Sequence, residues 1–403
     1  MNEKNNLTTG PVGKVLLRFV LPYLLSCFMQ TFYGMADLFV VGQFHGSEVT
    51  TVVLFSVFAI LLTALLLVLT NPIIHVMMTP EEAVADTRYY LLICFVGIPF
   101  IVAYNVISSV LRGIGDSRSP MCFVAVACVV NILLDFLFIG GFGMGAAGAA
   151  LATICGQAVS VLLAFVFMKR KNFGFALTRK EIRIQRELFR DILKVGIPVA
   201  VQDGLIQVAF VVITIIANSR GLVAATSVGI VEKIISFLFL VPSAFLSAIS
   251  AITAQNMGAG KPERARKSLG YGLLITVAWG LLCSLYNQFF PETLVGLFTK
   301  DAEVLAGGAS YMRAYSVDCL FAAIHFCFSG YFCGEGKSGI SFIHNMISIL
   351  LMRVPGAYLA SIYFPATLYP MGLAAPLGSL LSAIICIGFY IKEKNGEQKG
   401  VLL

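Results

Sequence analysis

Residues 96–121, VGIPFIVAYNVISSVLRGIGDSRSPM, return 221 positions later as residues 317–342, VDCLFAAIHFCFSGYFCGEGKSGISF. The two stretches align without a gap. The identical positions are Val96/Val317, Phe100/Phe321, Ser108/Ser329, Gly113/Gly334, Gly115/Gly336 and Ser117/Ser338. Internal duplication of hydrophobic helices is typical of secondary transporters. The sequence therefore predicts two related halves.

A second match shows that the first half is shorter than the second. Residues 16–22, LLRFVLP, correspond to residues 192–198, ILKVGIP, but at an offset of 176. The two offsets differ by 221 − 176 = 45 residues, which is the length of one membrane helix with its flanking loop. The gap falls near Thr50–Thr51, and nothing in the first half matches residues 227–267. We therefore expect the first half to lack the equivalent of its second helix.

The composition indicates a membrane protein. Hydrophobic residues make up 58% of the chain, charged residues make up 12%, and the mean hydropathy is +0.89. Long apolar runs recur along nearly the whole chain, and each approaches the roughly 20 residues that a helix needs to cross a bilayer. The predicted fold is an all-α polytopic membrane protein with two pseudo-symmetric helical lobes, of five and six helices. The expected spans are residues 15–44, 51–70, 88–111, 119–140, 145–168, 192–217, 227–253, 268–290, 309–333, 338–363 and 370–391.

Basic residues in the loops indicate the topology. Residues 169–194 contain nine Lys or Arg and three acids, so the positive-inside rule places them in the cytoplasm together with the N-terminus. Five helices would put these two segments on opposite sides of the membrane, whereas one more helix after Thr50 would put both inside. The same rule explains the net charge of +7 without any binding of nucleic acid. The predicted domains are an N-terminal lobe (1–168), a basic amphipathic cytoplasmic linker (169–191), a C-terminal lobe (192–391) and a cytoplasmic tail (392–403).

Four polar residues of the first half are predicted to form one layer inside the membrane. Asp37, Asn131, Asp135 and Thr153 each lie roughly 8–14 Å below the outer surface when the helices are counted at about 1.5 Å per residue. Ionisable groups at this depth are costly, and carboxylate, amide and hydroxyl oxygens suit H⁺ or Na⁺. The layer is therefore a candidate cation-coupling site, with Na⁺ possible at Asp37, Asn131 and Asp135. The alternative is that Asn131 and Asp135 only join helices by hydrogen bonds.

Polar residues of the second half are weaker candidates. Asp203 could simply face a cytoplasmic cavity, while Glu232 and Lys233 are placed to pair locally or to reach the membrane surface. Asp318 and His325 share one helix face, although a single membrane histidine is more often a packing group. The residues predicted to line a substrate cavity are Gln30, Tyr33, Asn105, Gln202, Asp203 and His325.

No arrangement of residues recommends an enzyme. The glycine-rich segments RGIGDS (112–117) and CGEGKS (333–338) look like phosphate loops, but neither follows a strand and both recur at equivalent repeat positions. They are interpreted as turns between helices. We find no Ser/His/Asp or Cys/His arrangement, and the ten cysteines form no CxxC pair. No cofactor is expected beyond a coupling ion.

Several motifs together resemble the multidrug and toxic compound extrusion (MATE) family of transporters over essentially the whole chain. They are Pro22-x14-Asp37-x4-Gly42, LRGIGDSRSP (111–120), NILLD (131–135), GAAGAALAT (145–153) and QNMGAGKPERA (255–265). The resemblance implies twelve helices in two six-helix lobes around a central cavity. One branch of the family couples through positions that match Asp37, Asn131 and Asp135. Another branch uses acids of the second lobe, and residues 192–217 contain no clear glutamate for that role.

The resemblance also implies a function. The expected activity is export of amphipathic, often cationic drugs or metabolites in exchange for Na⁺ or H⁺, by a monomer among the lipids of a bacterial inner membrane. Two alternatives remain open at this point. One is a flippase for lipid-linked precursors, which should line its cavity with several arginines, whereas the expected helices offer few besides Arg353. The other is an inactive, truncated relative.

Overall fold

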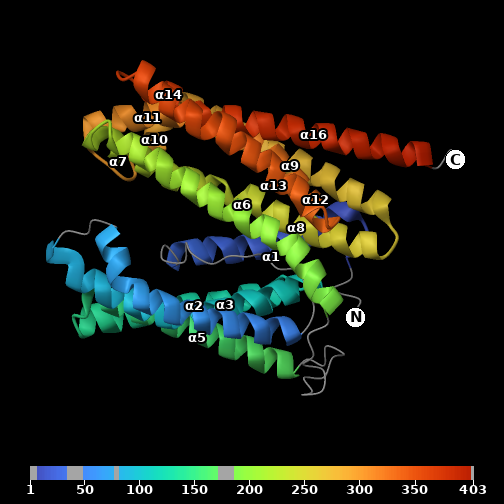
Figure 1. The fold of residues 1–403 in the computed structure, drawn as a ribbon, viewed down its shortest axis with the longest axis horizontal. Coiled ribbons are helices and arrows are strands. Elements are labelled where there is room, and N and C mark those ends of the chain that lie inside the picture. The colour runs from blue at the N-terminus through green and yellow to red at the C-terminus, as the bar shows by residue number, and fades with distance from the viewer. Residues whose placement is uncertain (1–6, 34–48, 77–80, 171–185, 401–403) are drawn as a thin grey trace. The chain divides into compact units, whose positions relative to one another are not determined.

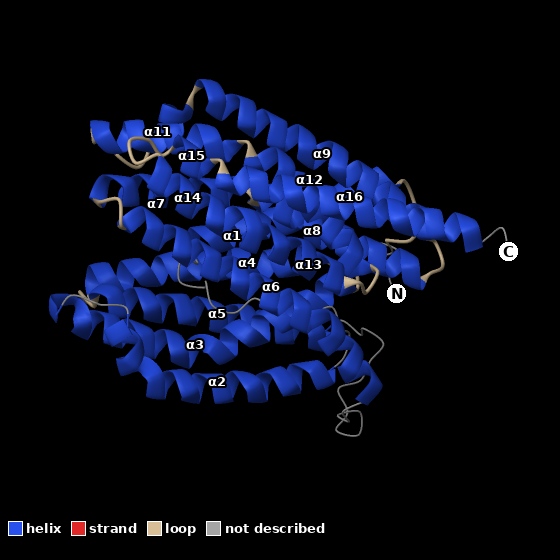
Figure 2. Cartoon of the chain, turned by 45° about the horizontal axis from the view of Figure 1, so that its top comes forward, coloured by secondary structure: helices blue, strands red, loops and turns tan. Residues whose placement is uncertain are grey.

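The computed structural model describes residues 7–33, 49–76, 81–170 and 186–400, and the regular elements in that part of the chain are all helical (Figure 1; Figure 2). Contacts between residues divide the chain into two compact units. One contains Leu21–Ile192, and the other contains Leu7–Val20 and Leu193–Leu403. The predicted all-helical fold is thereby confirmed.

The first unit is organised around its longest helix, α3, which packs against α2 and α5, while α4 also packs against α5. The core between α3, α4 and α5 contains Tyr104, Ile107, Phe123 and Val161. The elements of this unit are the part of α1 (Val12–Tyr33) from Leu21 onward, α2 (Val49–Val76), α3 (Glu81–Gly113), α4 (Arg118–Asp135), the π-helical segment η2 (Phe136–Gly141) and α5 (Gly145–Arg170).

The second unit is organised around α12, which packs against α8, α9 and α16. A Cβ atom on Gly330 of α12 would fall on the backbone carbonyl of Leu246 in α8, so this glycine allows close approach of the two helices. The elements are α6 (Arg186–Asn218), α7 (Leu222–Leu238), α8 (Leu240–Gly258), α9 (Pro262–Phe289), α10 (Pro291–Val295), α11 (Ala302–Ser316), α12 (Asp318–Gly334), α13 (Ser338–Ser348), η3 (Ile349–Arg353), α14 (Val354–Tyr363), α15 (Tyr369–Gly372) and α16 (Ala374–Gly400).

The helix boundaries reproduce the sequence repeat. Adding 221 to the limits of α3, residues 81 and 113, gives residues 302 and 334, where α11 begins and α12 ends. The first copy is one continuous helix, whereas the second is interrupted at Val317 and bent by 41°. Both copies continue into a helix that contains a π-helical segment, η2 or η3. Among the described residues of the first unit, no helix corresponds to α7 and α8.

The helices are long and apolar enough for a membrane protein of many spans. Eight described helices, or nine if α11 and α12 form one bent span, could cross a bilayer. The chain is therefore a polytopic membrane protein with the predicted helical architecture.

The helices extend beyond several of the expected limits. The span expected to end at residue 70 continues as α2 through Pro72 to Val76, because membrane helices tolerate proline where neighbouring groups satisfy the freed carbonyl. The expected linker, 169–191, overlaps two helices, since α5 runs to Arg170 and α6 begins at Arg186. The expected tail also begins as helix, because α16 continues to Gly400.

The N-terminal segment packs with the second unit, although it was expected to belong to the first lobe. The backbone carbonyls of Leu7, Thr8 and Gly10 accept hydrogen bonds from the end of α8, the turn that follows it and the start of α9. The donors are Asn256 Nδ2 at 3.3 Å, Lys261 Nζ at 3.1 Å and Arg264 Nη1 at 2.8 Å, respectively. We call this set of contacts the N-terminal clasp.

Candidate functional site

The structure brings together two members of the predicted polar layer. Asn131 of α4 is 3% exposed, and its Nδ2 atom donates a hydrogen bond to Thr153 Oγ1 of α5 at 3.4 Å. The Thr153 hydroxyl in turn donates to the backbone carbonyl of Ala149 at 3.0 Å. Counting residues from the membrane surface had placed Asn131 and Thr153 at similar depths on two different helices. This hydrogen bond also fits the alternative reading, in which Asn131 only joins helices.

A glycine explains why α4 and α5 approach so closely here. Gly156 lies three residues after Thr153, on the same face of α5. A Cβ atom at Gly156 would lie 3.1 Å from the carbonyl oxygen of Ala127 and 3.3 Å from Cβ of Asn131. Glycine therefore allows the contact that positions Asn131 against Thr153.

We expect Gly156→Val to separate the two helices and to destabilise the first unit by about 1–3 kcal/mol, the usual cost of overpacking. Gly140→Val is the matched control, because a Cβ atom at Gly140 would meet no atom within 4 Å. Thermal unfolding of the purified protein in detergent should show a lower midpoint for Gly156→Val than for the control. Equal midpoints would mean that the close contact at Gly156 is not needed.

Asp135 lies one turn beyond Asn131, at the end of α4 where the backbone changes to the π-helical segment η2. Such segments occur often at functional sites. Its Oδ1 atom is fully covered and has no hydrogen-bond partner among the described residues. A buried carboxylate oxygen of this kind normally has a partner such as water or an ion. Asp135 therefore has capacity to bind a proton or a cation.

Other predicted site residues can be placed only in part. Asp37 lies outside the described residues, and Gln30 and Tyr33 belong to the last residues of α1, 28–33, of which only the backbone is described. Asn105 is half-buried on α3. No group of three or more His, Cys, Asp or Glu in the described ranges could hold a metal ion. Since Asp37 is not among those residues, the predicted Na⁺ site stays a prediction.

Two of the three predicted cavity residues of the second unit, Gln202 and His325, contact α13. Gln202 of α6 accepts a hydrogen bond through Oε1 from the Ser341 hydroxyl at 2.9 Å, while the neighbouring Asp203 is half-buried. His325 is 7% exposed, and its ring lies edge-on to that of His344 with 5.7 Å between centroids. His344 Nε2 is 2.9 Å from the Ser329 hydroxyl. These contacts place His325 in a packed polar cluster.

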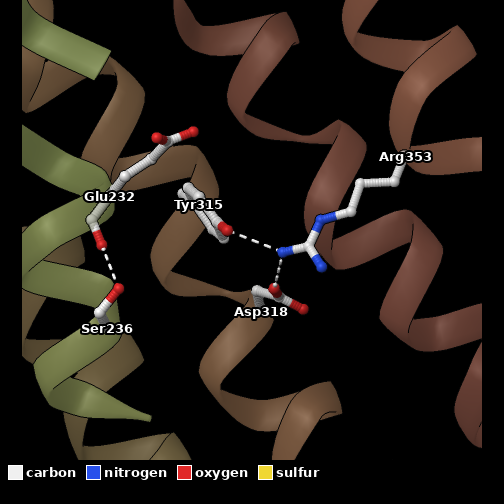
Figure 3. Close-up of polar contacts among 5 residues, drawn as sticks. All are labelled: Glu232, Ser236, Tyr315, Asp318 and Arg353. Carbon is white, nitrogen blue, oxygen red and sulfur yellow. Dashed lines mark hydrogen bonds and ion pairs between the residues drawn. The ribbon is translucent and has the colours of Figure 1, made fainter. Parts of the chain in front are cut away.

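A second charged site lies inside the second unit, and Figure 3 shows its members, Glu232, Tyr315, Asp318 and Arg353. We call these four residues the second-unit charge cluster. The Arg353 Nη2 atom, at the end of η3, lies 2.7 Å from the Tyr315 hydroxyl and 3.4 Å from Asp318 Oδ2. Tyr315 is 1% exposed and Asp318 is fully buried. Tyr315 and Asp318 lie on either side of the break between α11 and α12, so Arg353 binds both ends of that bend.

Aromatic rings surround the Arg353 guanidinium group. Its central carbon lies 5.3 Å from the centroid of Phe210 and 5.9 Å from that of Tyr315, within cation–π range. Glu232 approaches from α7, and Figure 3 shows no direct bond between it and Arg353. The sequence suggested local pairing of Glu232 with Lys233, but Lys233 is exposed and the Glu232 Oε1 atom has no hydrogen-bond partner.

The sequence singles out Asp318 and Arg353 separately, but it does not predict that they form an ion pair. They are 35 residues apart on different helices, so no periodicity relates them. The only available signal was that each is an ionisable residue within an apolar run.

Comparisons with known proteins agree on one family. A model of the MatE family matches residues 49–137 and 198–359. The probable multidrug resistance protein YpnP of Bacillus subtilis is 29% identical over 336 residues, covering 83% of this chain and 74% of the relative. The FAD transporter of Shewanella oneidensis is 24% identical over 449 positions, covering 98% of both chains.

Solved structures show the same fold. The crystal structure of MATE in complex with MaL6 is similar with a TM-score of 0.89 and 21% identity, covering 99% of this chain and 100% of that one. An outward-facing multidrug resistance MATE family transporter of the MOP superfamily is similar with a TM-score of 0.88 and 20% identity, covering 99% of both chains.

Proposed function

Because this chain belongs to the MatE family, whose members are transporters and not enzymes, we propose that it exports amphipathic drugs or metabolites from a bacterial cell. The match of the family model to both halves carries this proposal. The similarity to YpnP, a probable multidrug resistance protein, supports a drug-like substrate. We place the protein as a monomer of many spans among the lipids of the inner membrane.

The proposed driving force is exchange for Na⁺ or H⁺ at Asp37, Asn131, Asp135 and Thr153. The hydrogen bond from Asn131 to Thr153 supports this site, because it fixes two oxygen-bearing side chains at one level. The unpartnered Oδ1 atom of Asp135, one turn away, supports it as well. Entry of a cation into such a site would neutralise carboxylates that are costly inside a membrane. The substrates are proposed to be cationic, since a cation can replace the coupling ion near the same carboxylates.

We further propose that a complete transporter of this type contains about 45 more residues after Thr50. In the second half the family match begins at residue 198, which corresponds to Pro22 in the first half, yet the first match begins only at residue 49. The alignment with the FAD transporter runs over 449 positions, 46 more than the 403 residues of this chain. The start of the family match supports a gap before residue 49 or close to it, and the alignment length supports about 45 extra residues without placing them.

We call the chain with about 45 residues restored after Thr50 the restored chain, and we expect it to export drugs from cells when an ion gradient is present. Cells that lack other drug exporters and express the chain with the segment restored should be loaded with ethidium in Na⁺-free medium. Addition of Na⁺, or of a substrate for respiration that generates a proton gradient, should start export. The ionophore that dissipates the effective gradient should stop it. Export that continues after both gradients are removed would contradict exchange.

A further inference from the structure

An open pocket lies at one end of the second unit. Its volume is about 400 Å³, within the roughly 300–1,000 Å³ of typical small-molecule sites. It is lined by the start of α7 with the turn before it, by the first half of α11, and by the loop between α14 and α15. These elements lie together at the end of the unit opposite the C-terminus (Figure 1; Figure 2). The predicted cytoplasmic position of the C-terminal tail therefore places the pocket on the outer side of the membrane.

Arg220 supplies a fixed positive charge to the lining of the pocket. Its Nη2 atom donates hydrogen bonds to the backbone carbonyls of Phe364, Pro365 and Thr367 at 3.1, 2.7 and 3.1 Å, respectively. These bonds hold the guanidinium group against the end of α14 and the loop that follows it. The Nη1 atom has only a contact of 4.0 Å with the Met371 sulfur, and Nε has no partner among the described residues. Arg220 therefore has donors left for the anionic oxygens of a phosphate group.

Glu303 supplies a negative charge to the same lining. It lies exposed in the first turn of α11, and its carboxylate has no hydrogen bond or ion pair with another described residue. The nearby Asp301 carboxylate is already used, because its Oδ1 atom accepts hydrogen bonds from the backbone N–H groups of Glu303 and Val304 at 2.9 and 3.1 Å. The Ser227 hydroxyl of α7 donates to the Val304 carbonyl at 3.0 Å, which fixes the start of α11. One available cation and one available carboxylate in a fixed frame suit a zwitterion.

The pocket lies at the level expected for lipid headgroups. Four large apolar or aromatic side chains, each within two positions of a lining residue, are exposed around it: Leu222, Tyr363, Phe364 and Tyr369. Aromatic side chains at the ends of membrane helices are typical of the interface between the hydrocarbon and water. A lipid headgroup at this level can enter the pocket while its acyl chains stay against apolar side chains, whereas a soluble zwitterion gains nothing from them.

We propose that this pocket binds the headgroup of an ethanolamine phospholipid of the outer leaflet, with its phosphate on Arg220 and its ammonium group on Glu303. The proposal is independent of the export function, because it concerns a lipid bound at the outer end of the second unit. A phosphoglycerol headgroup has the same phosphate but no ammonium group. Glu303 should therefore favour phosphatidylethanolamine over phosphatidylglycerol.

Native mass spectrometry of the purified 403-residue chain tests the proposal, because it identifies and counts bound lipids. The chain in detergent is mixed with equal amounts of phosphatidylethanolamine and phosphatidylglycerol that carry the same acyl chains. Glu303→Gln should lower the ratio of bound ethanolamine lipid to bound glycerol lipid by about two- to fivefold, the effect expected of one exposed ion pair. The ammonium group loses its partner in this variant, and the anionic lipid loses a repelling charge.

Glu292→Gln is the matched control, since it removes an exposed carboxylate from the first turn of α10 and lies outside the pocket. It should keep the wild-type ratio. An unchanged ratio in Glu303→Gln, or an equal fall in Glu292→Gln, would overturn the proposal and leave the export function untouched.

Two competitors test which parts of the lipid are recognised. Glycerophosphoethanolamine has the headgroup without acyl chains, and diacylglycerol has the chains without the headgroup. Neither should displace phosphatidylethanolamine at equal concentration. Displacement by the first would mean that the pocket takes a soluble zwitterion and not a lipid. Displacement by the second would mean that Arg220 and Glu303 do not recognise the headgroup.

Discussion

Cells that express the 403-residue chain should remain as sensitive to amphipathic cationic drugs as cells without it. Cells that express the chain with about 45 residues restored after Thr50, copied from residues 228–267 or from a relative, should become resistant. The reason is that the absent helix should cover the polar layer at Asn131 and Asp135. Exposure of a carboxylate there to lipid costs about 2.5–3.5 kcal/mol on insertion scales. An odd number of helices in the first lobe would also reverse its orientation relative to the loop charges.

Minimal inhibitory concentrations and intracellular ethidium measure this effect. A chain with 45 residues of flexible polar sequence at the same place is the matched control, since it adds length without a helix. That control should remain inactive. If the 403-residue chain lowers intracellular ethidium as well as the restored chain does, eleven helices suffice for transport and the interpretation of the gap is wrong.

In the restored chain, Asp37→Asn and Asp135→Asn should each reduce ion-driven export to the level of cells without the transporter. An amide keeps the shape of the carboxylate, but it cannot alternate between an ionised state and a neutral or cation-bound state. Expression and melting should change little, because each substitution removes a charge that is costly in the membrane.

The rate of ethidium export under an imposed ion gradient measures the effect of these two substitutions. Glu292→Gln, which removes an exposed charge, should export at the wild-type rate. Export by Asp37→Asn at that same rate would place the coupling site elsewhere.

The architecture could be predicted from the sequence because it depends on repeated, local signals. Each of the eleven apolar runs overlaps a described helix, and the offset of 221 related α3 to α11 and α12. The break at Val317 could not be predicted, because its counterpart Val96 lies within a continuous helix of similar composition. The limits of the helices were also harder to predict. The span was expected to end at residue 70, before Pro72, whereas α2 continues through Pro72 to Val76.

The two candidate sites also differ in how much of their geometry could be predicted from the sequence. Asn131 and Thr153 could be related by counting residues from the membrane surface, since each helix rises by a fixed distance per residue. The ion pair of Arg353 with Asp318 depends on how η3 meets the start of α12. That meeting is a property of tertiary packing, and no sequence period encodes it.

The N-terminal clasp has a consequence for the order of events during synthesis. Leu7 is synthesised 249 positions before its partner Asn256. At about 5–20 residues per second, the start of the chain waits roughly 12–50 s before the side chains that bind it exist. During that interval its carbonyl groups must be satisfied by water or by insertion factors. A bulky N-terminal fusion should therefore delay maturation of the second unit more than an equal fusion at the C-terminus.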